Sequence, residues 1–308
     1  MPKKGFEEIR ERMLRSAKEG IKSAYQSEEY ALMQAVNAYI ETNRSYNLAY
    51  ERLSEWFGIY LPEVRMANPE TLARLVMAMK NGKDRGAIEE AVKEGGKADE
   101  VYKKLMSTIG REMQSGEGSA ISEFAKLTLS MSESLKGLDS YIKEASTRIL
   151  PNTTYLTDHM IAAELLGRAG SMERLATMPA GTVQLLGAEK ALFKHIKFGS
   201  RPPKYGILFK LPEITNAQRE IRGRIARVYA AKVCIALKAD HFSKNFIAEK
   251  LKNDLNESIR RIKEKPINPK KEAPPDRGFE RKGFQKRMGG RGFPRRKGGW
   301  RSNFGKNA

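Results

Sequence analysis

Two stretches of the chain repeat apolar residues at alternating steps of three and four. The first runs from residue 32 to residue 57, and among its repeat positions only Asn43 is polar. Such a seam predicts a long helix whose apolar stripe packs against another helix. The repeat positions are Leu32, Val36, Tyr39, Asn43, Tyr46, Tyr50, Leu53 and Phe57.

The second seam is longer, from residue 121 to residue 149, and corresponds to a helix of about 42 Å at ~1.5 Å per residue. Pro151 should end it, because the residue before a proline avoids the helical region. A stripe of this kind is either core within the chain or a contact with a second chain. For this seam we favour a coiled-coil hairpin that also contacts another chain, since one small domain would hardly cover so long a seam; for the seam at 32–57 core within the chain is the simpler interpretation. The residues predicted to dimerise are Ile121, Phe124, Met131, Leu135, Leu138 and Ile142.

Between the seams, Asn68 followed by Pro69 predicts a helix start, and apolar spacing continues that helix to Met79. Several glycines then interrupt the pattern, which resumes from Val101 through Ile109 to Met113. Residues 115–118 are typical of a hairpin tip. The first half is therefore predicted to be a long antiparallel coiled-coil hairpin within an all-α chain.

The second half predicts shorter helices around a compact core. Residues 215–218 have the spacing of a capping box, and the helix that they would open should turn Ile221, Ile225, Val228 and Ile235 inward. Its polar face would carry cations suited to phosphate, although a charged helix face is more often only solvated. These cations are Arg219, Arg222, Arg224, Arg227 and Lys232.

Charge changes the picture because it is unevenly placed. The 308 residues include 57 Lys and Arg against 37 Asp and Glu, yet residues 1–151 carry 23 of each sign. Residues 152–263 carry 20 basic and 10 acidic side chains, and residues 264–308 carry 14 and 4. A positive field concentrated in the C-terminal half favours a polyanionic partner such as nucleic acid, although a merely soluble basic surface is the simpler alternative.

The stretch from residue 264 to residue 308 is rich in glycine, proline and cations but has almost no aliphatic residues. It should therefore be a disordered basic tail. Three basic-Gly-Phe repeats, beginning at Arg277, Lys282 and Arg291, resemble RGG-type segments and predict non-specific RNA binding; a plain solubilising tail is the alternative.

No motif points to catalysis, to a metal site or to a cofactor. The three histidines lie in different segments, and neither a phosphate-binding glycine loop nor a nucleophile motif occurs. The single cysteine, Cys234, excludes an intrachain disulfide and is expected to be a buried apolar filler. With no apolar run of about 18 residues and a charged N-terminus, we expect no membrane span and a cytoplasmic location.

Several longer runs carry a family resemblance. Residues 187–197 are GAEKALFKHIK and residues 199–209 are GSRPPKYGILF. Residues 165–175, 178–186 and 222–233 match the flanks in the same order. Over roughly residues 10–262 the chain resembles the Nop domain family, especially its archaeal members in box C/D guide ribonucleoproteins.

The resemblance implies a non-catalytic scaffold. In the family, the Nop domain binds a kink-turn guide RNA already held by a ribosomal-type kink-turn-binding protein, the coiled coil forms a homodimer, and fibrillarin performs the 2′-O-methylation. The alternative is a Nop-domain RNA-binding assembly factor that acts without fibrillarin. Fibrillarin is a doubtful partner, because the α/β domain that docks it in archaeal members has no counterpart before residue 27.

The resemblance also predicts the site and the domains. Lys194 stands where the family usually has arginine, which removes a planar bidentate donor; Tyr205 could stack on a base. The expected units are an N-terminal helical extension (1–26), a dimerising coiled coil (27–150), a Nop domain (151–263) and the tail (264–308). The predicted binding residues are Gly187, Ala188, Glu189, Lys190, Ala191, Leu192, Phe193, Lys194, His195, Arg201, Pro202, Pro203, Lys204, Tyr205, Gly206, Arg222, Arg224, Arg227 and Lys232; the alternative for residues 187–194 is a packed helix junction with Phe193 in the core.

Overall fold

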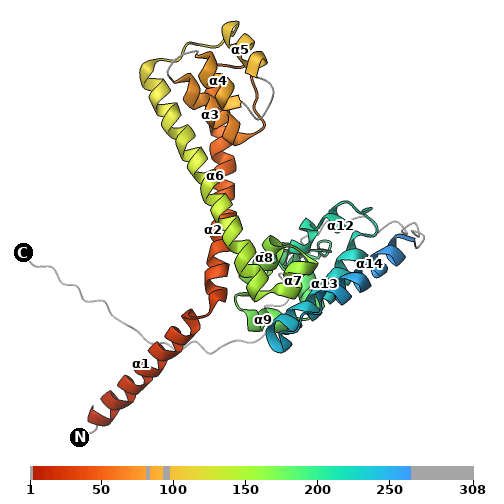
Figure 1. The fold of residues 1–308 in the computed structure, drawn as a ribbon. Helices are drawn as coiled ribbons and strands as arrows, with labels where there is room; N and C mark the ends of the chain where they lie inside the picture. The colour runs from red at the N-terminus through yellow and green to blue at the C-terminus, as the bar shows by residue number, and fades with distance from the viewer. Residues whose placement is uncertain (1–2, 81–83, 93–97, 265–308) are drawn as a thin grey trace, which may run out of the picture.

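The computed structural model describes residues 3–80, 84–92 and 98–264, and every regular element in these ranges is a helix. The all-α prediction is therefore confirmed. The molecule is elongated: two long helices separate a small helical head from a compact helical domain (Figure 1). The predicted basic tail lies outside the described residues from residue 265 onward.

The arm consists of α2 (Glu28–Phe57) and α6 (Ser115–Ile149), which lie side by side and run in opposite directions (Figure 1). Both predicted seams fall within these helices. α6 begins with a capping box in which the Glu117 carboxylate accepts from the backbone N–H of Gln114 at 3.3 Å. It ends before Pro151, as the sequence predicts.

The second seam is largely used within the chain. Ile121 shares a buried cluster with Leu53 and Phe57, Ile142 shares another with Leu32, and Leu135 is also buried. Phe124, Met131 and Leu138 are partly buried. The chain itself therefore covers three of the six residues that the sequence predicts as dimer contacts, and dimerisation stays a prediction.

The head, residues 58–114, caps the far end of the arm with α3 (Pro69–Met79), α4 (Arg85–Val92) and α5 (Ala98–Met106). The predicted start of α3 is confirmed, because the Asn68 side-chain oxygen accepts from the backbone N–H groups of Glu70 at 2.8 Å and Thr71 at 3.3 Å. Apolar residues of all three helices pack against the end of α2.

The predicted continuation of the α5 helix through Ile109 and Met113 is wrong. The Glu63 carboxylate accepts from the Thr108 hydroxyl at 2.7 Å and from the Ile109 N–H at 2.8 Å, and these bonds hold the chain in a loop that leaves Ile109 exposed. The same two bonds, the Ile109 N–H foremost, lower the pKa of Glu63. The predicted tip at residues 115–118 is the first turn of α6.

The compact domain contains the remaining helices, and the base of the arm belongs to its core. Leu32 and Val36 of α2 and Ile142 of α6 join one buried cluster with residues of α8 and α13. Its elements are α7 (Pro151–Leu156), α8 (His159–Ala169), α9 (Met172–Thr177), α10 (Ala180–Leu185), α11 (Glu189–Phe198), η2 (Ile207–Lys210), α12 (Pro212–Thr215), α13 (Arg222–Lys238), η3 (Ala239–Ser243) and α14 (Ala248–Glu264).

Two predictions for α13 are wrong. Thr215 caps nothing, because its hydroxyl donates to the carbonyls of Phe209 at 2.6 Å and Leu211 at 3.1 Å, and α13 begins only at Arg222. Ile235 is exposed, since α13 buries the face that carries small alanines and Tyr229. Cys234 is buried, as predicted, and its thiol donates to the Met178 carbonyl at 3.3 Å.

A buried polar cluster joins the start of α7 to the end of α13. The Asp240 carboxylate accepts from the backbone and side-chain N–H groups of Asn152 and from the N–H and hydroxyl of Thr153, at 2.7 to 3.0 Å. Asn152 also binds the backbone of Asn245 and Ile247. All four polar groups that face Asp240 are thus satisfied inside the chain.

Helix α1 (Lys3–Tyr25) projects away from the arm and the compact domain (Figure 1). The rings of Tyr25 and Tyr30 of α2 meet edge to face, with their centroids 6.1 Å apart. No described side chain of α1 belongs to either buried cluster. Among the described helices, none combines the length and the apolar character that a membrane crossing requires.

Candidate functional site

The run from Gly187 to Gly206 lies on the surface of the compact domain, beside the start of α13. The chain leaves α10, turns at Gly187, forms α11, turns again at Gly199 and returns through a proline-containing loop to η2. We call residues 187–206, together with Arg222, Arg224 and Arg227, the signature surface.

Two glycines permit the close approach of the segments that lead into and out of this run. Gly187 has a φ of +90°, and a Cβ there would lie 2.6 Å from a side-chain carbon of Ile207. A Cβ at Gly206 would lie 2.0 Å from the Leu186 carbonyl oxygen. The backbone N–H groups of Gly206 and Ile207 donate to the carbonyls of Gln184 and Leu186, both at 2.8 Å.

Side chains fix the same loop from within. Gln184, which is buried, donates its amide N–H to the Lys204 carbonyl at 2.5 Å. The His195 ring bonds to the Ser200 carbonyl, and the Glu189 carboxylate accepts from the Gly187 N–H at 2.6 Å. His195 and Glu189, both predicted as binding residues, therefore form hydrogen bonds within the chain that hold the conformation of this surface.

A stack of three side chains ties the loop to α13. The rings of Tyr205 and Phe209 lie parallel with centroids 4.5 Å apart, and the Arg222 guanidinium lies 5.8 Å from the Phe209 centroid. Arg222 also donates to the Ala217 carbonyl at 2.8 Å. A Cβ on Gly223 would lie 3.6 Å from the Lys204 side chain, so the Lys204 stem runs along this turn of α13. One face of Tyr205 is thus occupied within the chain.

Helix α11 has no buried residue, although its sequence is amphipathic. Phe193 is 72% exposed and Ile196 is 71% exposed. The packed-junction alternative, with Phe193 in the core, is wrong. The helix and the following loop also expose cations, namely Lys190, Lys194, Lys197 and Arg201. Apolar and cationic side chains are therefore presented together on one short, firmly held element.

The cations predicted on α13 differ in their surroundings. Lys232 pairs with Asp254 at 2.8 Å and lowers the pKa of that carboxyl, so its charge is already used inside the chain. Arg227 is exposed and Arg224 is half-buried. Within the part of the chain that the structure describes, neither Arg224 nor Arg227 forms an ion pair. These two arginines extend the positive surface beyond the loop.

Sequence reasoning missed several residues of this surface. Gln184 acts through its hydrogen bond to Lys204, 20 positions away, and Phe209 acts through its ring contact with Tyr205, four positions away. The motif itself indicates neither contact. Ile196, Lys197 and Phe198 continue the exposed face of α11, and the apolar spacing of that helix was a usable indication.

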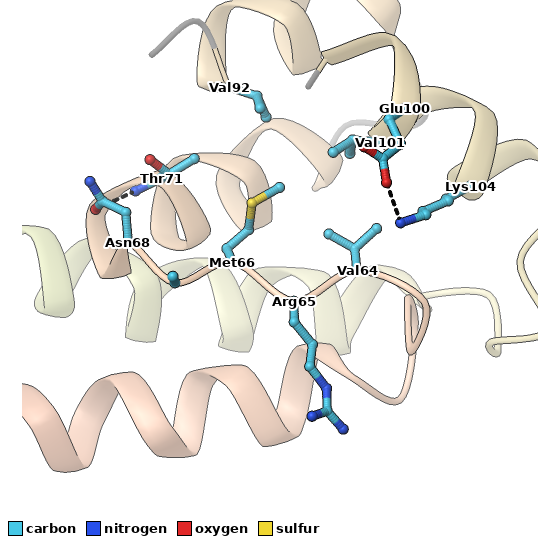
Figure 2. A pocket seen from close by; sticks show the side chains of 10 residues that line it. Val64, Arg65, Met66, Asn68, Thr71, Val92, Glu100, Val101 and Lys104 are labelled. Atoms are coloured by element: carbon cyan, nitrogen blue, oxygen red, sulfur yellow. Dashed lines mark hydrogen bonds and ion pairs between the residues drawn. The ribbon is translucent and has the colours of Figure 1, made fainter. Parts of the chain in front are cut away.

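A cavity of about 290 Å³ lies in the head, at the opposite end of the arm. Figure 2 shows it between the segment around Met66 and α5, where Lys104 pairs with Glu100 at 2.6 Å. Its walls combine apolar side chains with polar and charged ones in about equal number. In the described ranges no three His, Cys, Asp or Glu side chains gather as a metal site would need.

Comparison with known proteins matches most of the chain to one family. The model of a family described as "Nop: snoRNA binding domain, fibrillarin" covers residues 39–261. That range contains most of the arm, the head and nearly the whole compact domain, including the entire signature surface.

Two curated relatives and one solved structure are similar to the chain. An uncharacterised NOP5 family protein of Methanocaldococcus jannaschii is 34% identical over 273 residues, 86% of this chain and 65% of the relative. Human nucleolar protein 56 is 31% identical over 238 residues, 74% of this chain and 40% of the relative. The chain thus spans less than two thirds of the length of either. A chain in a crystal structure of a fibrillarin/Nop5p complex aligns with a TM-score of 0.48 at 23% identity, over 85% of this chain and 80% of that one.

Proposed function

This chain belongs to the Nop domain family, and from that premise we propose that it is a non-catalytic RNA-binding scaffold of a box C/D guide ribonucleoprotein. One observation carries the proposal: the run that matches the family signature forms a rigid surface on which cations and large apolar side chains are left exposed. These exposed side chains contribute little to the stability of the fold itself.

The ligand that we propose is a kink-turn guide RNA already bound by a ribosomal-type kink-turn-binding protein. Lys190, Lys194 and Arg201 supply charge for phosphate oxygens. Phe193 and Ile196 offer apolar area that RNA backbone would not cover, and this area suits the protein part of the composite. A surface with two kinds of contact binds well only when both partners are present.

Rigidity supports the same proposal. The bonds from Gly206, Ile207 and Gln184 hold the loop before any ligand arrives, so binding does not have to order the backbone. The stack of Tyr205 on Phe209 fixes the position of the loop relative to α13. Arg201 and Arg227 then extend from backbone whose position is already set before the ligand binds.

The test is a gel-shift experiment with a preformed complex of kink-turn RNA and its binding protein. Arg201→Ala combined with Lys204→Ala should weaken joining to that complex by at least tenfold, because charge-assisted phosphate contacts are lost. The matched control is Lys238→Ala combined with Lys244→Ala, which removes the same charge at the other end of α13. Equal mobility shifts for both double variants would contradict the proposal.

We also propose that two copies associate through the arm and head. Because Ile121, Leu135 and Ile142 of the α6 seam are buried within the chain, the contact would rely on exposed apolar residues as well. Ile109 is 90% exposed although Glu63 holds it in place. Other exposed apolar residues of this region include Leu48, Ile59, Met106 and Leu127.

Ile109→Glu should shift the chain from dimer to monomer in sedimentation velocity experiments, since it would bring two like charges into the contact. Ile235→Glu is the control, because Ile235 is an exposed isoleucine of the compact domain. A dimer that survives Ile109→Glu unchanged would remove the head from the proposed interface.

Fibrillarin is the proposed methyltransferase partner. Pull-down of fibrillarin by this chain, with and without a separately supplied docking domain, separates the two versions of the function. Capture under either condition supports the methylation scaffold. Absence of capture under both would leave an RNA-binding assembly factor that works without fibrillarin.

A further inference from the structure

Helix α1 has an apolar face that nothing in the described chain covers. Its large apolar side chains recur at helical spacing and are all half to three-quarters exposed. The helix projects away from the rest of the molecule (Figure 1). The side chains concerned are Phe6, Ile9, Met13, Leu14, Ile21 and Tyr25.

The charges beside this apolar face follow a definite order. Glu7, Glu11, Lys18 and Lys22 are separated by four, seven and four residues, which brings all four to one flank of the helix. None of them forms a hydrogen bond or an ion pair with another described residue. Arg15, four residues after Glu11 and three before Lys18, lies on the same flank. The flank thus carries an acidic pair in its first half, a basic pair in its second half and one further cation at its centre.

We propose that α1 pairs in antiparallel orientation with α1 of a second copy of this chain. In an antiparallel pair each flank meets the same flank of the partner helix, whereas in a parallel pair it meets the opposite one. Glu7 then faces Lys22 of the other copy and Glu11 faces Lys18. The residue numbers of both pairs add to 29, so a single register satisfies both, with its centre between Leu14 and Arg15.

Other occupants fit the helix less well. α1 carries seven basic and four acidic side chains, so its net charge would attract RNA or an anionic membrane, but neither of them supplies cations for Glu7 and Glu11 at the edge of the apolar face. The face of one 23-residue helix is also small for a stable interface by itself. The pairing is therefore expected to be weak on its own and to gain strength where a second contact holds copies together.

Cross-linking tests the geometry in the full chain. Leu14 and Ile21 are 50% and 55% exposed on the same face, which makes them a matched pair. With Cys234→Ser as background, Leu14→Cys should cross-link between copies through a short bismaleimide. Ile21→Cys should not, because the two Ile21 positions would lie about 20 Å apart along the pair at ~1.5 Å per residue.

Charge exchange tests the register. Glu7→Lys with Glu11→Lys, and separately Lys18→Glu with Lys22→Glu, should each lower the Leu14→Cys cross-link at least fivefold. An equimolar mixture of the two variants should restore it as a mixed dimer, since all four facing pairs become attractive again.

Three outcomes would overturn the proposal: equal cross-linking at Leu14 and Ile21, a mixture that stays as low as either variant, or no cross-link at all. Protection of Leu14→Cys from maleimide by anionic vesicles, without a cross-link, would assign the face to a membrane surface instead. Loss of RNA binding would leave these readouts unchanged. Loss of the arm contact would lower the cross-link yield as a whole but would keep the difference between Leu14 and Ile21 and the recovery in the mixture, because these depend only on α1.

Discussion

The two ends of α13 use their side chains for opposite purposes. At the C-terminal end, Asp240 is buried and its carboxylate accepts four hydrogen bonds from Asn152 and Thr153. Toward the N-terminal end, Arg227 is exposed, and Arg201 and Phe193 of the signature surface are exposed as well. One end is complete within the chain, and the other leaves polar and apolar groups without partners on a backbone that is equally well fixed.

This difference separates stability from recognition. A buried polar group must be satisfied inside the chain, because leaving it unpaired costs about 1–3 kcal/mol. An exposed cation costs little, so it can be kept for a ligand. Substitutions at the Asp240 end should therefore change folding, and substitutions at the signature surface should change binding. The predictions below test this division.

The largest effect is expected for Asp240→Ala. It would leave the N–H groups of Asn152 and Thr153 and the Thr153 hydroxyl buried without an acceptor, and should lower the free energy of unfolding by about 3 kcal/mol or more. Urea denaturation followed by circular dichroism measures it. Asp254→Ala is the control: Asp254 pairs with Lys232 at the surface, and its loss should barely move the midpoint. Equal midpoints for the two variants would contradict a structural role for the Asp240 cluster.

The next effect is expected for Gly206→Ala. The new Cβ would lie 2.0 Å from the Leu186 carbonyl oxygen, so the loop has to detach from residues 184–186. We expect a loss of about 1–3 kcal/mol in stability, as in other overpacked sites, together with loss of binding to the RNA–protein complex. Gly181→Ala is the control because nothing lies within 4 Å of a Cβ there. A Gly206→Ala variant that binds normally would show that the loop need not be held.

Phe193→Ala should affect binding alone. The ring is 72% exposed, so the free energy of unfolding should stay within about 0.5 kcal/mol of the parent value. Joining to the kink-turn complex should weaken about tenfold. Phe242→Ala, which removes a 64% exposed ring at the other end of α13, should leave binding intact. Isothermal titration calorimetry on both variants gives the comparison. If both lose affinity equally, the specificity of the α11 surface is disproved.

Whether a structural feature could be predicted from the sequence depends on how far apart along the chain the interacting residues are. The seams at residues 32–57 and 121–149, the Asn68 cap and the stop at Pro151 follow from local periodicity and backbone sterics, and all four are found in the structure. Thr215 failed as a cap because two carbonyls within six residues compete for its hydroxyl. Ile235 failed because buried alanines, which a search for large aliphatic residues ignores, decide which face of α13 packs.

The site shows the same limit. Residues 187–206 were identified from their motifs, but the motifs do not reveal that Gln184 and Phe209 hold the loop, and they left a buried Phe193 open as the alternative. Those facts depend on contacts between segments that meet only in the folded chain. An amphipathic helix normally predicts a packed face, and only the structure shows that the apolar face of α11 is not covered.

The smallest effect separates Lys232 from Arg227, two cations on one helix. Lys232 lowers the pKa of Asp254, so the stabilisation from this pair is complete at neutral pH and is lost on acidification, as the pH falls through that lowered pKa. Lys232→Ala should return the Asp254 pKa towards its ordinary value, which NMR titration measures, and should leave RNA affinity unchanged. Arg227→Ala should instead reduce the slope of log affinity against log salt concentration by about one, as expected for one lost phosphate contact. An unchanged slope for Arg227→Ala, or a reduced one for Lys232→Ala, would mean that ion pairing within the chain does not decide which cations of α13 reach the RNA.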